Sequence, residues 1–258
     1  MSYIVADKLV KKFGNGDAAV AAVADASFQI EAGDFVGIMG ESGAGKSTLL
    51  GIMGAMNAPT SGKLIVDDID IYGLGQEQRA DFRREFLGFI FQSFHLVPYL
   101  TVMENVMLPL AIVKAGRHKK MEMAQAALAQ VGLLDKARRL PNQISGGEKE
   151  RVAIARSIVN EPPILLADEP TGNLDTKTTR EIMELLLRFN QEGMTIVMVT
   201  HSPACAGYAR RIMRVTDGRL AEEESRIRSI KKRERNEGKK EPLFSQDKNL
   251  VAGSLPTG

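Results

Sequence analysis

A glycine-rich loop between a strand-like run and a helix-like run constrains this 258-residue chain more than any other feature. The run GDFVGIMG, residues 33–40, is short and apolar and ends in glycine, which is typical of a buried strand entering a loop. The loop GESGAGKST follows, and KSTLLGIMGAM, residues 46–56, has the composition of a helix. Gly40, Gly45, Lys46 and Ser47 fit the pattern G-x-x-x-x-G-K-[ST]. The sequence therefore predicts an α/β chain with a mostly parallel sheet.

This loop has the chemistry of a phosphate cradle. Glycines let backbone N–H groups turn toward phosphate oxygens, and the following helix N-terminus adds partial positive charge. Lys46 supplies a charge for the β- and γ-phosphates, and the Ser47 hydroxyl is a ligand for Mg²⁺. We therefore expect ATP to bind along the whole loop, at Gly40, Glu41, Ser42, Gly43, Ala44, Gly45, Lys46, Ser47 and Thr48.

Two further apolar runs end in polar side chains that fit the same site. PILLADEP, residues 163–170, predicts a central strand that delivers Asp168 to Mg²⁺ and Glu169 to the attacking water. MTIVMVTHS, residues 194–202, predicts a third strand, and His201 at its end favours a γ-phosphate contact. The alternatives are that the two acids cap the following turn and that the histidine is structural.

The middle of the chain has a different pattern of apolar and polar residues. Three segments within residues 93–160 carry helical spacing and no strand pattern. We therefore expect a helical subdomain, residues 92–160, inserted into a sheet core of residues 1–91 and 161–220, which begins with an antiparallel β subdomain. A charged tail is expected at residues 221–258.

The segment SGGE, residues 145–148, raises a separate question. Ser145 as N-cap and Glu148 three residues later predict a capping box at a helix start. Capping does not explain Gly146 and Gly147, which weaken a first helical turn by up to about 1 kcal/mol each relative to alanine. Two glycines there are favoured when another group approaches the backbone closely.

With these motifs the chain resembles the ATP-binding subunits of ABC transporters. ISGGEKERVAIAR, residues 144–156, is similar to that family's signature motif, L-S-G-G-Q, and Glu148 replaces its glutamine. The resemblance extends to the phosphate loop, Gln92 in FQS, ILLADEP, NLD at residues 173–175 and His201. The Glu148 charge lies near a triphosphate in this scheme, and we expect Lys149 and Arg151 to offset it.

The resemblance implies a P-loop NTPase core and a head-to-tail homodimer with two ATP molecules at its interface. Each ATP lies on the phosphate loop of one copy and against the signature of the other. The resemblance assigns nucleotide binding in trans to Ser145, Gly146, Gly147, Glu148 and Asp175. It assigns catalysis to Glu169, His201, Lys46 and Gln92, and Mg²⁺ binding to Ser47, Gln92 and Asp168. It also implies an aromatic ring on the adenine, for which Phe13 is the best candidate and Tyr3 a weaker one.

Further residues bear on the partners. After Gln92 come Phe94, Leu96, Val97, Tyr99 and Leu100, in a region that forms a groove for a membrane subunit in the family. The segments FQSFHLVPYLTVMENVMLPL and LLADEPTGNLD most resemble the subgroup that serves lipoprotein release, macrolide export and cell-division control. We expect an ATPase that drives separate membrane subunits for export or extraction. The alternative is a regulatory ATPase that transmits motion to a membrane partner without transport.

Composition sets the remaining expectations. The net charge of +2 is too small to favour nucleic acid as the main partner. The single cysteine excludes an internal disulfide, and there is no signal-type segment or apolar run of about 18 residues. We expect a cytoplasmic protein, peripheral on the cytoplasmic face of the cell membrane. Residues 226–240 carry eight basic residues, either a solvated tail or a contact for anionic lipid or an acidic partner.

Overall fold

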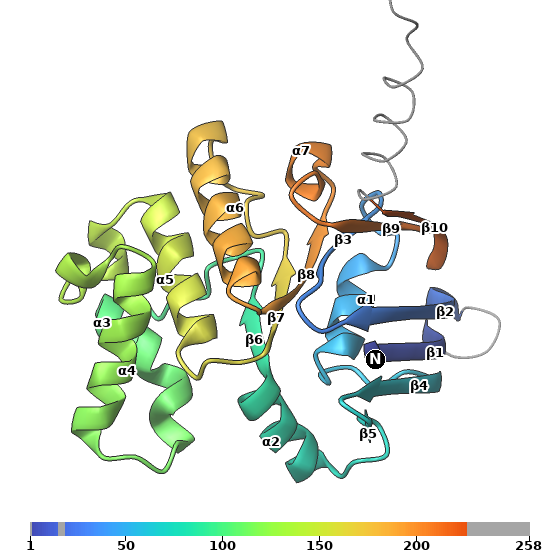
Figure 1. The fold of residues 1–258 in the computed structure, drawn as a ribbon, viewed down its shortest axis with the longest axis horizontal. Coiled ribbons are helices and arrows are strands. Elements are labelled where there is room, and N and C mark those ends of the chain that lie inside the picture. The colour runs from blue at the N-terminus through green and yellow to red at the C-terminus, as the bar shows by residue number, and fades with distance from the viewer. Residues whose placement is uncertain (1, 15–18, 226–258) are drawn as a thin grey trace, which may run out of the picture. The chain divides into compact units, whose positions relative to one another are not determined.

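A six-stranded sheet forms the centre of the chain in a computed structural model that describes residues 2–14 and 19–225, with backbone alone for 221–225 (Figure 1). The strand order is β10-β9-β3-β8-β7-β6, and every neighbouring pair is parallel except β9 with β10. The strands are β3 Phe35–Met39, β6 Leu87–Ile90, β7 Ile164–Asp168, β8 Thr195–Thr200, β9 Arg211–Thr216 and β10 Arg219–Ser225. Parallel pairing brings the carboxyl ends of β3, β7 and β8 to one edge, where ligands bind in α/β sheets.

A second, antiparallel sheet is built from the first part of the chain. Its order is β2-β1-β4-β5, with β1 Ser2–Phe13, β2 Val20–Glu31, β4 Ser61–Val66 and β5 Ile69–Asp70. The expected α/β class, mostly parallel sheet and N-terminal antiparallel sheet are therefore confirmed.

The helices fall into those that flank the strands and those inserted between β6 and β7. The first set is α1 Lys46–Met53, α2 Gln76–Phe86, α6 Thr176–Gln191 and α7 Pro203–Ala206. The inserted set is α3 Val102–Met107, α4 Arg117–Gln130 and α5 Gly146–Ile158, with short 3₁₀ turns η2 Leu108–Ile112, η3 Leu134–Lys136 and η4 Pro141–Gln143. Helices α3, α4 and α5 pack on one another and stand together beside the sheet (Figure 1).

Two hydrophobic cores lie on the two faces of the main sheet. Strand residues alternate between them: Phe35 and Leu165 belong to the core shared with α3–α6, whereas Val36 and Leu166 belong to the core shared with α1 and the antiparallel sheet. This alternation is the period of two that a strand imposes on its side chains. Burial on both faces explains why the central strands read as continuous apolar runs.

The end of the chain differs from expectation at one point. Strand β10 continues to Ser225 and pairs with β9, so residues 221–225 belong to the sheet and not to a charged tail. The basic segment 226–240 lies outside the described residues. Within the described residues, no helix is long and apolar enough to cross a membrane.

Candidate functional site

The phosphate loop joins β3 to α1, and two of its glycines, Gly40 and Gly45, stand where no side chain fits. A Cβ on Gly40 would lie 2.3 Å from the Val215 carbonyl oxygen, and one on Gly45 would lie 1.9 Å from that of Ala22. Gly45 also has φ +99° and directly precedes the first residue of α1. Because backbone from β2 and β9 approaches this closely, the glycines are fixed by the fold itself, and the loop backbone is held in place.

Lys46 and Ser47 lie at the start of α1 with defined partners. The Lys46 ammonium donates to the carbonyl oxygen of Glu41 within the loop at 2.7 Å, and the residue is buried. The Ser47 hydroxyl donates to Asp168 Oδ1 at 3.1 Å, which joins the loop to the end of β7. Burial raises the pKa of Asp168 and nearby Glu169 adds to the rise, whereas the Ser47 hydrogen bond and Lys46 oppose it.

Glu169 and His201 meet at the ends of two adjacent strands, β7 and β8. Glu169 Oε2 lies 2.7 Å from His201 Nδ1, and the glutamate N–H donates to Val199 O at 3.0 Å. Glu169 has φ +50°, a left-handed conformation that costs a non-glycine residue roughly 1–2 kcal/mol. Strain of this kind is found where the surrounding structure holds a residue in place for function.

One hollow of about 540 Å³ is lined by all four of the predicted catalytic residues. Its lining comes from four stretches of chain that are far apart in sequence: the phosphate loop, Gln92 after β6, Glu169 after β7 and His201 after β8. Ala22 of β2 also lines it and was not predicted, because a small apolar strand residue gives no sequence signal. The structure thus brings Lys46, Ser47, Gln92, Glu169 and His201 together.

An adjoining hollow of about 630 Å³ shares Glu41, Ser42, Gly43 and His201 with the first. It is completed by the β9 end and the turn after it, from Arg214 to Asp217. No sequence signal marks this segment, which becomes a neighbour of the loop because β9 pairs with β3.

Phe13, the predicted adenine contact, lies at the end of β1 and does not line either hollow. Its ring is 51 % exposed, with the Lys11 ammonium 5.2 Å from the ring centroid. Residues 15–18, which follow it closely in sequence, lie outside the described residues.

The signature segment forms the predicted helix start. Ser145 is the N-cap of α5, its Oγ accepts from the Glu148 N–H at 3.2 Å, and Glu148 Oε2 accepts from the Ser145 N–H at 2.8 Å. The capping box is therefore confirmed. None of the signature residues lines the two phosphate-loop hollows of its own chain.

The two glycines of this segment differ from each other. A Cβ on Gly147 would lie 2.4 Å from Thr178 Cγ2 of α6, whereas one on Gly146 would only touch Leu174 at 4.0 Å. The close packing of α5 on α6 within the chain therefore explains why residue 147 is a glycine. Packing within the chain does not explain the glycine at position 146.

The charge of Glu148 is balanced differently from the expectation. Lys136 Nζ lies 3.6 Å from Glu148 Oε1, while Arg151 pairs with Glu181 of α6. The hydrogen bond from the Ser145 backbone lowers the pKa of Glu148, and Lys136 lowers it further. Glu148 is therefore an ionised cap supported by Lys136. The expected offset by Arg151 is wrong, because that side chain is directed to another acid.

Asp175 and Gln92 also take part in local contacts. Asp175 is the N-cap of α6 and accepts from the Thr178 hydroxyl at 2.6 Å, a bond that lowers its pKa. The carbonyl oxygen of Gln92 accepts from Asn173 Nδ2 at 3.3 Å. The NLD segment is thereby joined to the strand end that carries Gln92.

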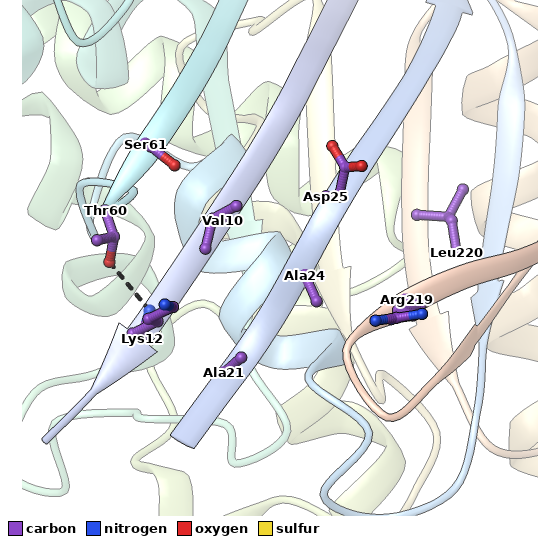
Figure 2. Close-up of a pocket in the computed structure, with 9 residues that line it drawn as sticks. All are labelled: Val10, Lys12, Ala21, Ala24, Asp25, Thr60, Ser61, Arg219 and Leu220. Atoms are coloured by element: carbon purple, nitrogen blue, oxygen red, sulfur yellow. Dashed lines mark hydrogen bonds between the residues drawn. The ribbon is translucent and has the colours of Figure 1, made fainter. Parts of the chain in front are cut away.

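A third hollow, of about 560 Å³, lies over β1, β2, the start of β4 and the start of β10 (Figure 2). Figure 2 shows Lys12, Asp25 and Arg219 around it, with a hydrogen bond from the Lys12 N–H to Thr60 Oγ1 at 3.0 Å. No predicted site residue lines it. We assign no part of the nucleotide site to this hollow.

A family model and two known proteins that match this chain all belong to one family. The model of the family described as "ABC transporter" matches residues 23–172. An uncharacterised ABC transporter ATP-binding protein, MJ1508 of Methanocaldococcus jannaschii, is 42% identical over 219 residues, which are 85% of this chain and 98% of that protein. The macrolide export ATP-binding/permease protein MacB of Syntrophobacter fumaroxidans is 41% identical over 88% of this chain and 32% of its own length.

A solved structure of a similar chain shows two copies arranged as a dimer. The structure of the ATP-binding cassette MJ0796, a dimer in a post-hydrolysis state bound to ADP and Pi, shares 39% sequence identity with this chain. The match covers 86% of this chain and 98% of the MJ0796 chain, with a TM-score of 0.79.

Proposed function

Because this chain belongs to the ABC transporter family, we propose that its ATPase activity drives an export or extraction complex through separate membrane subunits. The chain is an ATP-binding subunit of that family, with the α/β cassette fold and the ATPase chemistry that the fold carries.

One observation carries the catalytic proposal. The phosphate loop with Lys46 at its end and three side chains from strand ends, Gln92, Glu169 and His201, all line a single hollow. In this arrangement the loop N–H groups and Lys46 bind the β- and γ-phosphates. Glu169 accepts the proton of the attacking water, and His201 orients that carboxylate through the contact at 2.7 Å.

The donor set fits Mg²⁺. Ser47 Oγ and Asp168 Oδ1 are oxygen donors 3.1 Å apart beside the loop, and Gln92 lines the same hollow. Among the described residues no group of three or more His, Cys, Asp or Glu could hold a metal alone. Mg²⁺ commonly takes only one or two protein ligands and completes its shell with phosphate and water. When bound, the ion neutralises charge on the phosphoryl oxygens.

The dimer proposal is supported by what the single chain leaves incomplete. Ser145, Gly146 and Gly147 do not line the phosphate-loop hollows of their own chain, and Gly146 has open space over its backbone. The MJ0796 cassette is a dimer. In our proposal the signature of a second copy closes each nucleotide site, with Asp175 near the same interface.

The coupling of hydrolysis to a membrane subunit is placed in the helical insertion, residues 92–160. Arg156 of α5 donates to the carbonyl oxygens of Phe94 and His95 at 2.8 and 2.6 Å, and buried Asn105 of α3 donates to those of Val97 and Leu100. The segment after Gln92 is therefore held by two helices, one of which begins with the signature. Tyr99 on this segment is 79 % exposed and supplies an aromatic contact for a partner.

Two comparisons support separate membrane subunits and export. MJ1508, named as an ATP-binding protein, is matched over 98% of its length. MacB, named for macrolide export, is matched over 32% of its own length, and its name includes a permease. We accordingly place the chain on the cytoplasmic face of the membrane.

The proposal is tested by measuring phosphate release from Mg²⁺-ATP by the purified chain, with Lys46→Ala as the inactive control. Proteins that co-purify with the chain from membranes are then reconstituted in vesicles. ATP-dependent transport supports the exporter. Reproducible hydrolysis without transport by the complete complex favours the regulatory alternative.

A further inference from the structure

The turn that connects α3 to α4 exposes an unusual number of aliphatic side chains. Leu108 and Ile112 of η2 are 41 % and 66 % exposed, and Met121 in the first turns of α4 is 38 % exposed. The Lys120 ammonium donates to the Ala111 carbonyl oxygen at 3.2 Å, which ties the start of α4 to η2. We name residues 108–121 the α3–α4 corner.

The α3–α4 corner is also strongly cationic. It contains Lys114, Arg117, His118, Lys119 and Lys120 and no acidic residue. The next acid, Glu122, lies 3.3 Å from His118 Nδ1 and 3.6 Å from Lys119 Nζ. Lys114 and Arg117 are exposed and pair with no acid in the part of the chain that the structure describes. The corner therefore keeps a positive charge next to exposed aliphatic groups.

Helix stability does not account for these charges. Gly116, the N-cap of α4, offers no side-chain cap, and the first turn holds Arg117, His118, Lys119 and Lys120. Cations at a helix N-terminus oppose the helix dipole and are unfavourable there. These basic residues are unfavourable for the helix itself and lie beside exposed aliphatic side chains. An external partner explains them better than helix stability does.

We propose that the α3–α4 corner contacts the surface of an anionic lipid bilayer. Its cations pair with lipid headgroups, while Leu108, Ile112 and Met121 enter the headgroup–acyl boundary. Basic residues beside Leu, Ile or Met are the composition that binds at such an interface. The inference rests on the proposed membrane location, but it concerns a surface outside the nucleotide site and does not depend on hydrolysis.

Insertion is tested by fluorescence, because the chain contains no tryptophan. Ile112→Trp places the only indole in the corner. Leu134→Trp places it at an exposed position, 48 % exposed, beyond the other end of α4, roughly 20 Å away along the helix. With vesicles of phosphatidylcholine and phosphatidylglycerol at 7:3, we expect a blue shift for the first variant and none for the second. No shift for Ile112→Trp, or an equal shift for both, would overturn the proposal.

Charge is tested by co-sedimentation of the full chain with the same vesicles. Lys114→Gln, Arg117→Gln and Lys119→Gln together remove three positive charges from the corner. Lys8→Gln, Lys12→Gln and Lys63→Gln remove three from exposed positions on the antiparallel sheet and form the matched control. Each Lys or Arg near an anionic surface strengthens binding about fivefold, so we expect the corner variant to bind at least tenfold more weakly and the control to change less.

Three results would count against this site. Equal binding of the corner variant and the unmodified chain would overturn it, as would loss of binding in the control variant alone. Corner-dependent binding to DNA or poly-glutamate without binding to vesicles would identify a different anionic partner. ATPase activity is measured in parallel: normal hydrolysis with failed vesicle binding removes only this inference, whereas absent hydrolysis in the unmodified chain removes the proposed function.

Discussion

His201 and Glu169 face each other at the ends of neighbouring parallel strands, with Nδ1 of the histidine 2.7 Å from Oε2 of the glutamate. The glutamate side chain is largely buried, whereas that of the histidine is 67 % exposed. The carboxylate is thereby held beside the phosphate loop by a residue from another strand. Such a position suits a group that must accept a proton from water in a fixed direction.

Replacing Glu169 by glutamine tests that role. The amide keeps the size of the side chain but cannot accept the proton, so turnover should fall by about 10²–10⁴-fold while ATP still binds. Steady-state phosphate release and equilibrium binding of a fluorescent ATP analogue measure the two effects. Glu184→Gln, an exposed acid on α6, is the control and should keep full activity. Wild-type hydrolysis by the Glu169→Gln variant would refute the general-base role.

The two signature glycines should respond oppositely to alanine. At Gly147 the added methyl would lie 2.4 Å from Thr178 Cγ2, and the Thr178 hydroxyl is bonded to Asp175, so Gly147→Ala should destabilise the fold by about 1–3 kcal/mol. At Gly146 there is room, and Gly146→Ala should be neutral or stabilise the helix by up to about 1 kcal/mol. Urea denaturation gives both values.

A second substitution isolates the cause. Thr178→Ser removes the clashing methyl and keeps the hydroxyl, so it should recover most of the stability lost in Gly147→Ala. If the double variant is as unstable as Gly147→Ala, contact with the Thr178 methyl is not the constraint.

Glu150 should make stability depend on pH. It is 2 % exposed, its Oε1 has no hydrogen-bond partner among the described residues, and burial raises its pKa from 4.5 to about 8 against the opposing effect of Arg156. Between these pH values the unfolded state releases the proton and the native state keeps it, so the free energy of unfolding falls as pH rises. At about 1.4 kcal/mol per pKa unit, the loss approaches 5 kcal/mol as an upper limit.

Glu150→Gln removes this titration while resembling the protonated acid. The variant and the unmodified chain should have similar stability at pH 5, and the variant should be more stable by pH 8. Denaturation curves at pH 5, 6.5 and 8 measure the difference. Parallel pH profiles for the two proteins would contradict the assignment.

Ser145→Arg tests the signature without touching the nucleotide loop of the same chain. The bulky cation should block the interface between two copies, so ATP-dependent dimerisation should be lost while one chain still binds ATP. Light scattering and nucleotide binding are measured together, with Ser61→Arg as a control that adds the same charge in the third hollow. Loss of nucleotide binding by the Ser145→Arg monomer would mean that the signature acts in cis.

The local chemistry could be predicted from sequence because it depends on short patterns. The phosphate loop, the acids after PILLADEP and the capping box of Ser145 and Glu148 are each set by neighbours within a few residues. Their convergence on one site could also be predicted, because the carboxyl ends of parallel strands share one edge of the sheet. The resemblance supplied Gln92, whose place in the hollow depends on the strand order.

What the sequence did not show arises from contacts between distant segments. Ala22 in the hollow, Thr178 against Gly147 and Lys136 beside Glu148 depend on how sheets and helices pack. Arg151 illustrates the limit: it is near Glu148 in sequence, but the α5–α6 packing turns it to Glu181. The sequence shows which side chains are charged, but the packing of the helices determines which charges pair.

Cross-linking tests whether the signature of one copy closes the nucleotide site of the other. Ser42→Cys in the phosphate loop and Ser145→Cys in the signature are introduced together in the Glu169→Gln chain. The native Cys205 is 3 % exposed, and the Glu169→Gln chain without added cysteines is the control. On mild oxidation with ATP, we predict a covalent species of twice the chain mass that is absent without nucleotide. An intrachain disulfide at the mass of one chain, or no disulfide, would contradict closure of the site by a second copy.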